Sequence, residues 1–235
     1  MIDDNGDFDY TTAVQIEHVY TPSDRFLDVF YSFASRLESL QRYHKFISRY
    51  LDFYLAGLEA SWLLTNIAQS EYCKWVTHQE IKLGDHEYFG PMLRGSILAH
   101  VFSLLETLLH EVTKDICEQL RVELAFPEKG MPYIDKYLWV LKNRCGVIIS
   151  IDKQDRRKIA ALMELRNRYI HSLNREIPAD ILKVLGKSAD GKGSKIDISA
   201  NHINDGFALA GRLAHKLDSA YWEFYEAHEL TASQQ

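Results

Sequence analysis

Arg166, Asn167 and His171 are the residues of this chain whose types and spacing best suit catalysis. They lie within a segment that we expect to be helical. Because successive residues of an α-helix are rotated by about 100°, Asn167 and His171 share a face and the long Arg166 side chain lies beside them. A histidine can transfer protons near neutral pH, and an arginine keeps a positive charge that can stabilise a phosphorane. The three residues therefore suit phosphodiester cleavage without a metal ion.

The same pattern resembles the signature of HEPN domains, a helical family that includes RNA-cleaving toxins and antiphage effectors. In that signature, Asn, Asp or His directly follows an arginine, and four to six residues separate this arginine from a later histidine. The motif lies late in a helical bundle. Arg166, Asn167 and His171 match it, with four residues between the arginine and the histidine. The resemblance covers about residues 92–229 and implies that Arg166 and His171 are catalytic.

Three further residues are expected to bind phosphate or RNA, or to orient the catalytic groups. Asn167 and Arg168 follow Arg166 directly in the sequence. Glu106 lies on the preceding long helix, from which a carboxylate can orient the arginine. Neither a metal ion nor another cofactor is expected.

The resemblance also implies a homodimer. One histidine cannot easily act as acid and base on opposite sides of a phosphorus atom, and HEPN proteins typically place two copies of this helix across one composite cleft. The expected activity is a metal-independent endoribonuclease, a toxin or antiphage effector that leaves 2′,3′-cyclic phosphate ends. An antitoxin or defence protein is a possible partner. Leu173 stands where one branch of the family has a tyrosine that a nucleotidyltransferase modifies, so we do not expect that form of control.

Two other interpretations remain open for the same residues. His171 can be a helix C-terminal histidine favoured by the helix dipole, with Arg166 paired to Glu164 or Glu176. Alternatively, the chain is a noncatalytic HEPN-like helical dimer that binds a partner protein or a nucleotide.

Several weaker patterns are interpreted as structural. Arg94 and His100 are also close in sequence, but Gly95 follows the arginine and the pair opens an earlier helix. His110 and Glu111 begin like a zinc-protease motif, yet Lys114 replaces the second histidine ligand.

Charge and composition limit the possible classes of protein. Hydrophobic residues make up 46% and charged residues 26% of the chain, as in ordinary globular proteins. The net charge of −6 argues against nonspecific coating of nucleic acid, although the segment 153–195 is rich in lysine and arginine. We expect a cytoplasmic protein without a membrane segment, for three reasons. The N-terminus is acidic, charged residues or histidine interrupt the apolar runs, and the cysteines are unpaired.

Hydrophobic periodicity predicts an all-α fold, a HEPN-type bundle with an additional N-terminal helical hairpin. Residues 1–22 form an acidic lead-in, 23–84 the N-terminal helical subdomain and 92–229 the HEPN-like bundle. Between them, the glycines and proline of 84–91 predict a turn-rich linker. Within the bundle, helices are expected over about 92–124, 132–145, 152–175 and 199–229.

Overall fold

The computed structural model describes residues 15–23, 28–63, 69–127, 130–171, 178–185 and 198–232. At positions 55–63, 69–89, 91, 171, 179 and 229–232 it describes the backbone alone. These residues form six helices and no strand, which confirms the all-α class: α2 (Asp28–Leu63), α3 (Gln69–Leu120), α4 (Tyr133–Arg144), α5 (Lys153–His171), α6 (Ala179–Val184) and α7 (Ala200–Ala232). Most of the predicted acidic lead-in lies outside the described residues.

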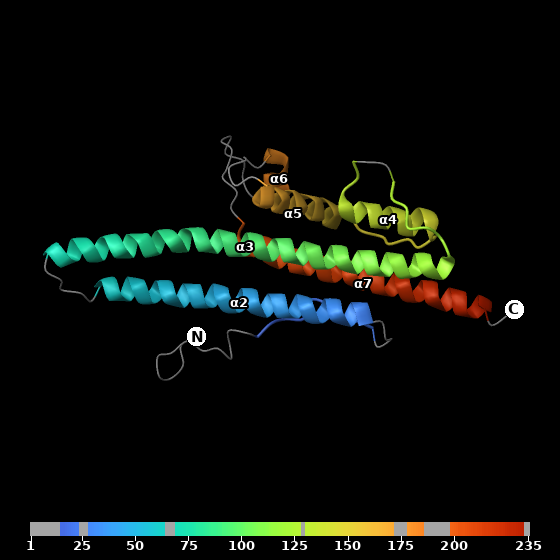
Figure 1. The fold of residues 1–235 in the computed structure, drawn as a ribbon, viewed down its shortest axis with the longest axis horizontal. Helices are drawn as coiled ribbons and strands as arrows, with labels where there is room; N and C mark the ends of the chain where they lie inside the picture. The colour runs from blue at the N-terminus through green and yellow to red at the C-terminus, as the bar shows by residue number, and fades with distance from the viewer. Residues whose placement is uncertain are drawn as a thin grey trace.

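The central element is α3, which contacts α2, α4, α5 and α7. In Figure 1, α2 runs antiparallel to α3, and the pair extends beyond the other helices as a long hairpin. The last helix, α7, lies along the second half of α3, while α4 and α5 cover the side of α3 that faces away from α2. The helix that carries Arg166 therefore rests on both α3 and α7.

The predicted linker at 84–91 is wrong, because these residues lie inside the continuous helix α3. Gly and Pro disfavour a helix interior, and a proline there costs about 3 kcal/mol. Packing of α2 along α3 can offset such local preferences, which tertiary contacts often override. As a result, no break in the chain separates the predicted N-terminal subdomain from the predicted bundle.

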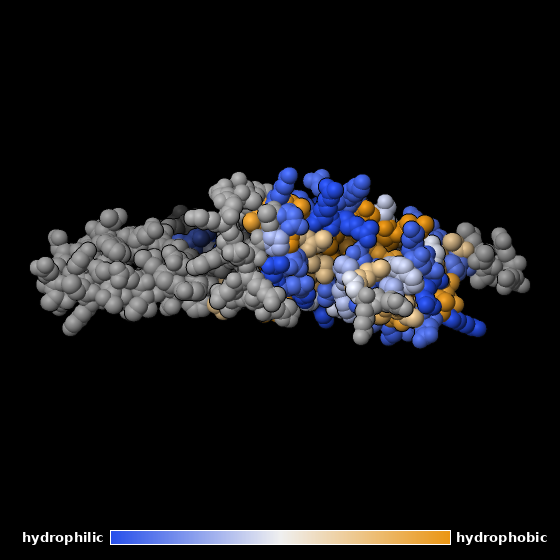
Figure 2. All heavy atoms as spheres, turned by 90° about the horizontal axis from the view of Figure 1, so that it is seen from above, coloured by the Kyte–Doolittle hydropathy of each residue, from blue (hydrophilic) through white to orange (hydrophobic). Residues whose placement is uncertain are grey.

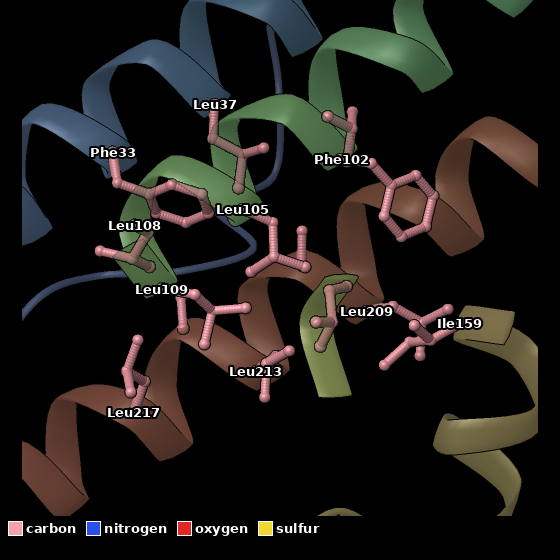
Figure 3. Packing of buried hydrophobic residues seen from close by; sticks show 14 of the residues in the cluster. Phe33, Leu37, Phe102, Leu105, Leu108, Leu109, Ile159, Leu209, Leu213 and Leu217 are labelled. Atoms are coloured by element: carbon pink, nitrogen blue, oxygen red, sulfur yellow. The ribbon is translucent and has the colours of Figure 1, made fainter. Parts of the chain in front are cut away.

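The hydrophobic core joins these two predicted parts. Figure 3 shows Phe33 and Leu37 of α2 packed toward the leucines of α3, with leucines of α7 on the other side. Each of these side chains is at most 3% exposed, and burying one such side chain contributes about 1.5–3 kcal/mol. The first half of α2 is therefore part of the same core as α3, α5 and α7.

The Met92–Leu120 part of α3 is long and apolar enough to cross a bilayer, judged by length and composition alone. No such segment was expected from the sequence. Its apolar side chains, including Ile97, Val101, Leu105 and Leu108, are buried among the other helices. That burial is typical of the core helix of a folded domain.

Helix ends in the bundle largely match the predictions. Asp152 precedes α5 and its Oδ1 accepts the backbone N–H of Asp155 at 2.8 Å, as an N-cap residue does. Gly146 follows α4 with a φ of +72°, which glycine tolerates. Ile170, near the end of α5, is 48% exposed, and the short helix α6 was not predicted.

An ion pair between Asp155 and Arg212 fixes the start of α5 to α7. The Arg212 guanidinium donates to both Asp155 oxygens, at 2.7 and 2.9 Å, and these hydrogen bonds hold the pKa of the Asp155 carboxyl below its usual value. A lowered pKa stabilises the fold above the unfolded-state pKa, and this contribution disappears as the pH falls through the folded-state pKa.

We therefore expect Asp155→Asn to lower the free energy of unfolding by about 1 kcal/mol at pH 7, a modest value because Arg212 is half exposed. Urea unfolding at several pH values measures it. The difference from the unmodified protein should begin to shrink below about pH 4, the usual pKa of an aspartate in the unfolded chain, and should vanish only at the lower pH where the folded-state carboxyl is protonated as well. Asp205→Asn, which removes a longer pair with Lys158 whose carboxylate is more exposed, is the control and should have a smaller effect. A pH-independent difference would contradict this account.

Candidate functional site

Arg166 lies on the side of α5 that faces α3, and three side chains surround its guanidinium. Nη1 donates to Asn167 Oδ1 at 3.2 Å and lies 4.0 Å from Glu106 Oε1. Nη2 donates to Ser103 Oγ at 3.5 Å. The Arg166 and Glu106 side chains are each 19% exposed. The arginine is thus held in place while part of it stays open to solvent.

The guanidinium is only lightly engaged by these neighbours. Its distance to Glu106 exceeds that of a hydrogen bond, and the contact to Ser103 is at the long limit of one. The buried Arg166 Nε has no hydrogen-bond partner within the described part of the chain. Since an arginine has five N–H donors in a planar fork, the group can still bind an anion such as a phosphate.

Glu106 supports the positive charge of Arg166 from α3. Burial raises the pKa of the Glu106 carboxyl, and the nearby Arg166 charge only partly opposes this shift. A raised pKa means that the ionised carboxylate is unfavourable to folding, so stability falls as the pH rises toward the folded-state pKa. The residue is therefore better suited to orienting Arg166 than to stabilising the fold.

Replacing Glu106 by glutamine is expected to affect stability and activity in opposite directions. The free energy of unfolding at pH 7 should stay equal or rise, because no buried carboxylate has to ionise. The RNA cleavage expected from the sequence should fall roughly tenfold, since the misplacement of a charged group by a fraction of an ångström weakens transition-state binding. Urea unfolding and a cleavage assay on the same preparations measure both effects. A parallel loss of stability and activity would indicate a merely structural carboxylate.

The other predicted site residues have different outcomes. Asn167 contacts Arg166 as expected. Arg168 is turned toward its own helix, where its Nε donates to Glu164 at 2.6 Å. Among the described residues Arg166 forms an ion pair with Glu106 and none with Glu164, whose carboxylate binds Arg168 instead. The His171 side chain and all of Glu176 lie outside the described residues; the α5 backbone ends at position 171.

A contact that the sequence analysis missed fixes the end of α5 on α3. The Tyr169 ring lies directly over Gly95, and its hydroxyl donates to the Met92 carbonyl at 2.9 Å. A Cβ atom at Gly95 would lie 2.3 Å from the ring, so only glycine allows this approach. A glycine inside a predicted helix was the available signal, because it often marks a close contact. Tyr169 thus positions the helical turn that carries Arg166 and ends at position 171.

We expect Gly95→Ala to lower the free energy of unfolding by about 1–3 kcal/mol, because the added methyl must displace Tyr169. The RNA cleavage expected from the sequence should fall as well, since the end of α5 moves. Denaturant unfolding and cleavage rates test this. Gly206→Ala is the matched control: its Cβ would meet only Leu98 Cδ1, at 3.0 Å, and a side-chain end can shift. Equal effects of the two variants would contradict the positioning role of Tyr169.

An open groove of about 900 Å³ lies beside the Arg166 cluster, between the first turns of α4 and one side of α5. We call it the α4–α5 groove; it is lined, among others, by Glu106, Tyr133, Lys153, Arg157, Arg166 and Asn167. Seen from above, hydrophilic side chains gather over the middle of the molecule, with apolar ones among them toward the α4 end (Figure 2). The Arg166 cluster is therefore accessible from a groove large enough for several nucleotide-sized groups.

The patterns interpreted as structural make contacts within the fold. Arg94 Nε donates to the Ile198 carbonyl, and His100 Nδ1 donates to the Ser96 carbonyl at 2.8 Å. His110 Nδ1 lies 3.2 Å from the Tyr137 hydroxyl. Among the residues whose side chains are described, no three His, Cys, Asp or Glu side chains converge as metal ligands.

The chain was compared with protein-family models, curated proteins and solved structures, and none of them matches it.

Proposed function

We propose that the chain is a metal-independent endoribonuclease of HEPN type, acting in the cytoplasm as a toxin or antiphage effector. The contacts of Arg166 carry this proposal. Its guanidinium is held by Glu106, Asn167 and Ser103, yet retains donors toward an accessible groove. A cation fixed in this way suits the charge that develops on a phosphorane.

The reaction requires two proton transfers and no cofactor. A base removes the proton of the ribose 2′-hydroxyl, and the 2′-oxygen attacks the adjacent phosphorus. Arg166 stabilises the negative charge of the phosphorane. An acid then protonates the departing 5′-oxygen, which leaves a 2′,3′-cyclic phosphate and a 5′-hydroxyl. In this proposal His171 is the proton-transfer residue, because histidine exchanges protons near neutral pH.

Two copies of the chain complete the proposed site. Acid and base act on opposite sides of the phosphorus, so one histidine cannot readily fill both roles in one step. A homodimer in which both α5 helices face one cleft supplies the second histidine. An antitoxin or defence partner protein would then hold the activity in check.

Cleavage of RNA by the purified protein in the presence of EDTA tests the proposal. We expect cleavage that persists with the chelator and a dimer in solution by light scattering. Expression of the active chain should also slow bacterial growth. A folded, non-toxic dimer that cleaves no RNA would instead support the noncatalytic binding protein.

A further inference from the structure

The α4–α5 groove extends well beyond the Arg166 cluster. On α5 its lining residues run from Lys153 to Asn167 at intervals of three and four positions, so they form one face of the helix. At 1.5 Å per residue, this face is about 21 Å long. The proposed chemistry at Arg166 uses only one part of it.

Two positive charges along this wall have no acidic partner among the described residues. Lys153 and Arg157 are exposed, and neither forms an ion pair with any part of the chain that the structure describes. The neighbouring Arg156 differs, because it donates to Asp135 at 2.6 Å. On a chain with a net charge of −6, two uncommitted cations on one wall of a groove favour a polyanion.

The opposite wall presents an aromatic ring. Tyr133 is 47% exposed, yet it contacts a buried neighbour. Its hydroxyl accepts a hydrogen bond from the Tyr137 hydroxyl at 3.1 Å. The two rings meet edge to face with centroids 5.3 Å apart, and Tyr137 is 1% exposed. Lys136 Nζ lies 5.9 Å from the Tyr133 ring centroid and adds another positive charge. An exposed aromatic ring that a hydrogen bond keeps in place beside positive charges is typical of a base-stacking site.

We propose that the α4–α5 groove binds single-stranded RNA, with an unpaired base stacked on Tyr133 and backbone phosphates along Lys153 and Arg157. This inference rests on the proposed ribonuclease function and adds the substrate class and a binding site outside Arg166 and His171. An unpaired base exposes the π-face that stacking requires, whereas a duplex hides it within the helix. The ring therefore selects single strands, and the cations supply affinity that does not depend on sequence.

Binding of a fluorescent RNA to the full chain, measured by anisotropy, tests the proposal independently of cleavage. The probe is a 2′-O-methyl oligonucleotide of about ten residues, which has no free 2′-hydroxyl and stays intact; its pre-formed duplex is the comparison. We expect the single strand to bind more tightly than the duplex. Tyr133→Ala should weaken single-strand binding roughly 5- to 100-fold, while Tyr133→Phe, which keeps the ring, should bind nearly as well as the unmodified chain.

The salt dependence of RNA binding tests whether Lys153 and Arg157 contact phosphates. The double variant Lys153→Gln with Arg157→Gln should lower the slope of log K against log salt by about 1.4, the value for two phosphate contacts on a single strand. Arg144→Gln with Lys183→Gln removes the same charge from exposed positions outside the groove and should leave the slope unchanged. Circular dichroism confirms that each variant is folded, and Tyr133→Leu replaces Tyr133→Ala if the latter is not.

The outcomes separate this inference from the proposed function. Tyr133-dependent binding by a chain that never cleaves natural RNA would support the binding site and contradict the ribonuclease. If the chain cleaves RNA but the variants at Tyr133, Lys153 and Arg157 bind single strands as tightly as the unmodified chain, the binding site alone is contradicted. Equal affinity for single strand and duplex, or no RNA binding at all, would also overturn it.

Discussion

Replacing Arg166 by alanine is expected to lower the rate of RNA cleavage by roughly 100- to 1000-fold, the usual cost of losing one fixed group that stabilises transition-state charge. The fold should persist, because the guanidinium makes one long ion pair and two weak hydrogen bonds. Its loss also removes the charge that partly opposes the raised pKa of the Glu106 carboxyl, so this pKa should rise further. Single-turnover cleavage rates and circular dichroism on the same preparation measure the two properties.

Two companion variants sharpen this test. Arg166→Lys keeps the charge but loses the planar fork, so its activity should lie between those of the wild type and Arg166→Ala. Arg144→Ala removes an exposed arginine at the end of α4 and should cleave RNA at the normal rate. Near-normal cleavage by Arg166→Ala would exclude Arg166 from the chemistry.

Replacing His171 by alanine is expected to lower cleavage by roughly 100- to 10,000-fold, the range for the loss of a general acid or base. The dimer should remain, because the substitution removes a proton-transfer group at the last position of α5 and leaves the contact of Tyr169 with Gly95 in place. Cleavage rates together with light scattering test this. His100→Ala, on the surface of α3, is the matched control and should retain activity. A fully active His171→Ala dimer would contradict the assignment.

Much of the fold could be predicted because its helices carry clear periodic patterns. Ile203, Phe207, Leu213 and Leu217 recur at helical intervals, and all are buried in α7. The start of the helix expected near position 152 was also predictable, since a capping side chain such as that of Asp152 hydrogen-bonds to the backbone of its own helix. The segment 84–91 was mispredicted because glycine and proline are local signals, whereas α3 is a continuous helix with α2 packed along it.

Part of the candidate site could be predicted for the same reason. Arg166 and Asn167 are neighbours on one helix, so their contact follows from the sequence. The Glu106 contact required the correct choice of partner helix, and that expectation agrees with the observed distance. The roles of Ser103, Tyr169 and Tyr133 were not foreseen, because they depend on how far α5 and α4 are shifted along α3. Periodicity gives the buried face of a helix but not its register against another helix.

The central claim is that this chain cleaves RNA through the RNA's own 2′-hydroxyl, with Arg166 and His171 as catalysts. The most direct test is to locate a cleavage site in an oligonucleotide and then replace the single ribose on its 5′ side by deoxyribose, with EDTA present throughout. The account predicts a 2′,3′-cyclic phosphate end from the all-ribose substrate and no cleavage at the deoxyribose position. Undiminished cleavage at that position would contradict it.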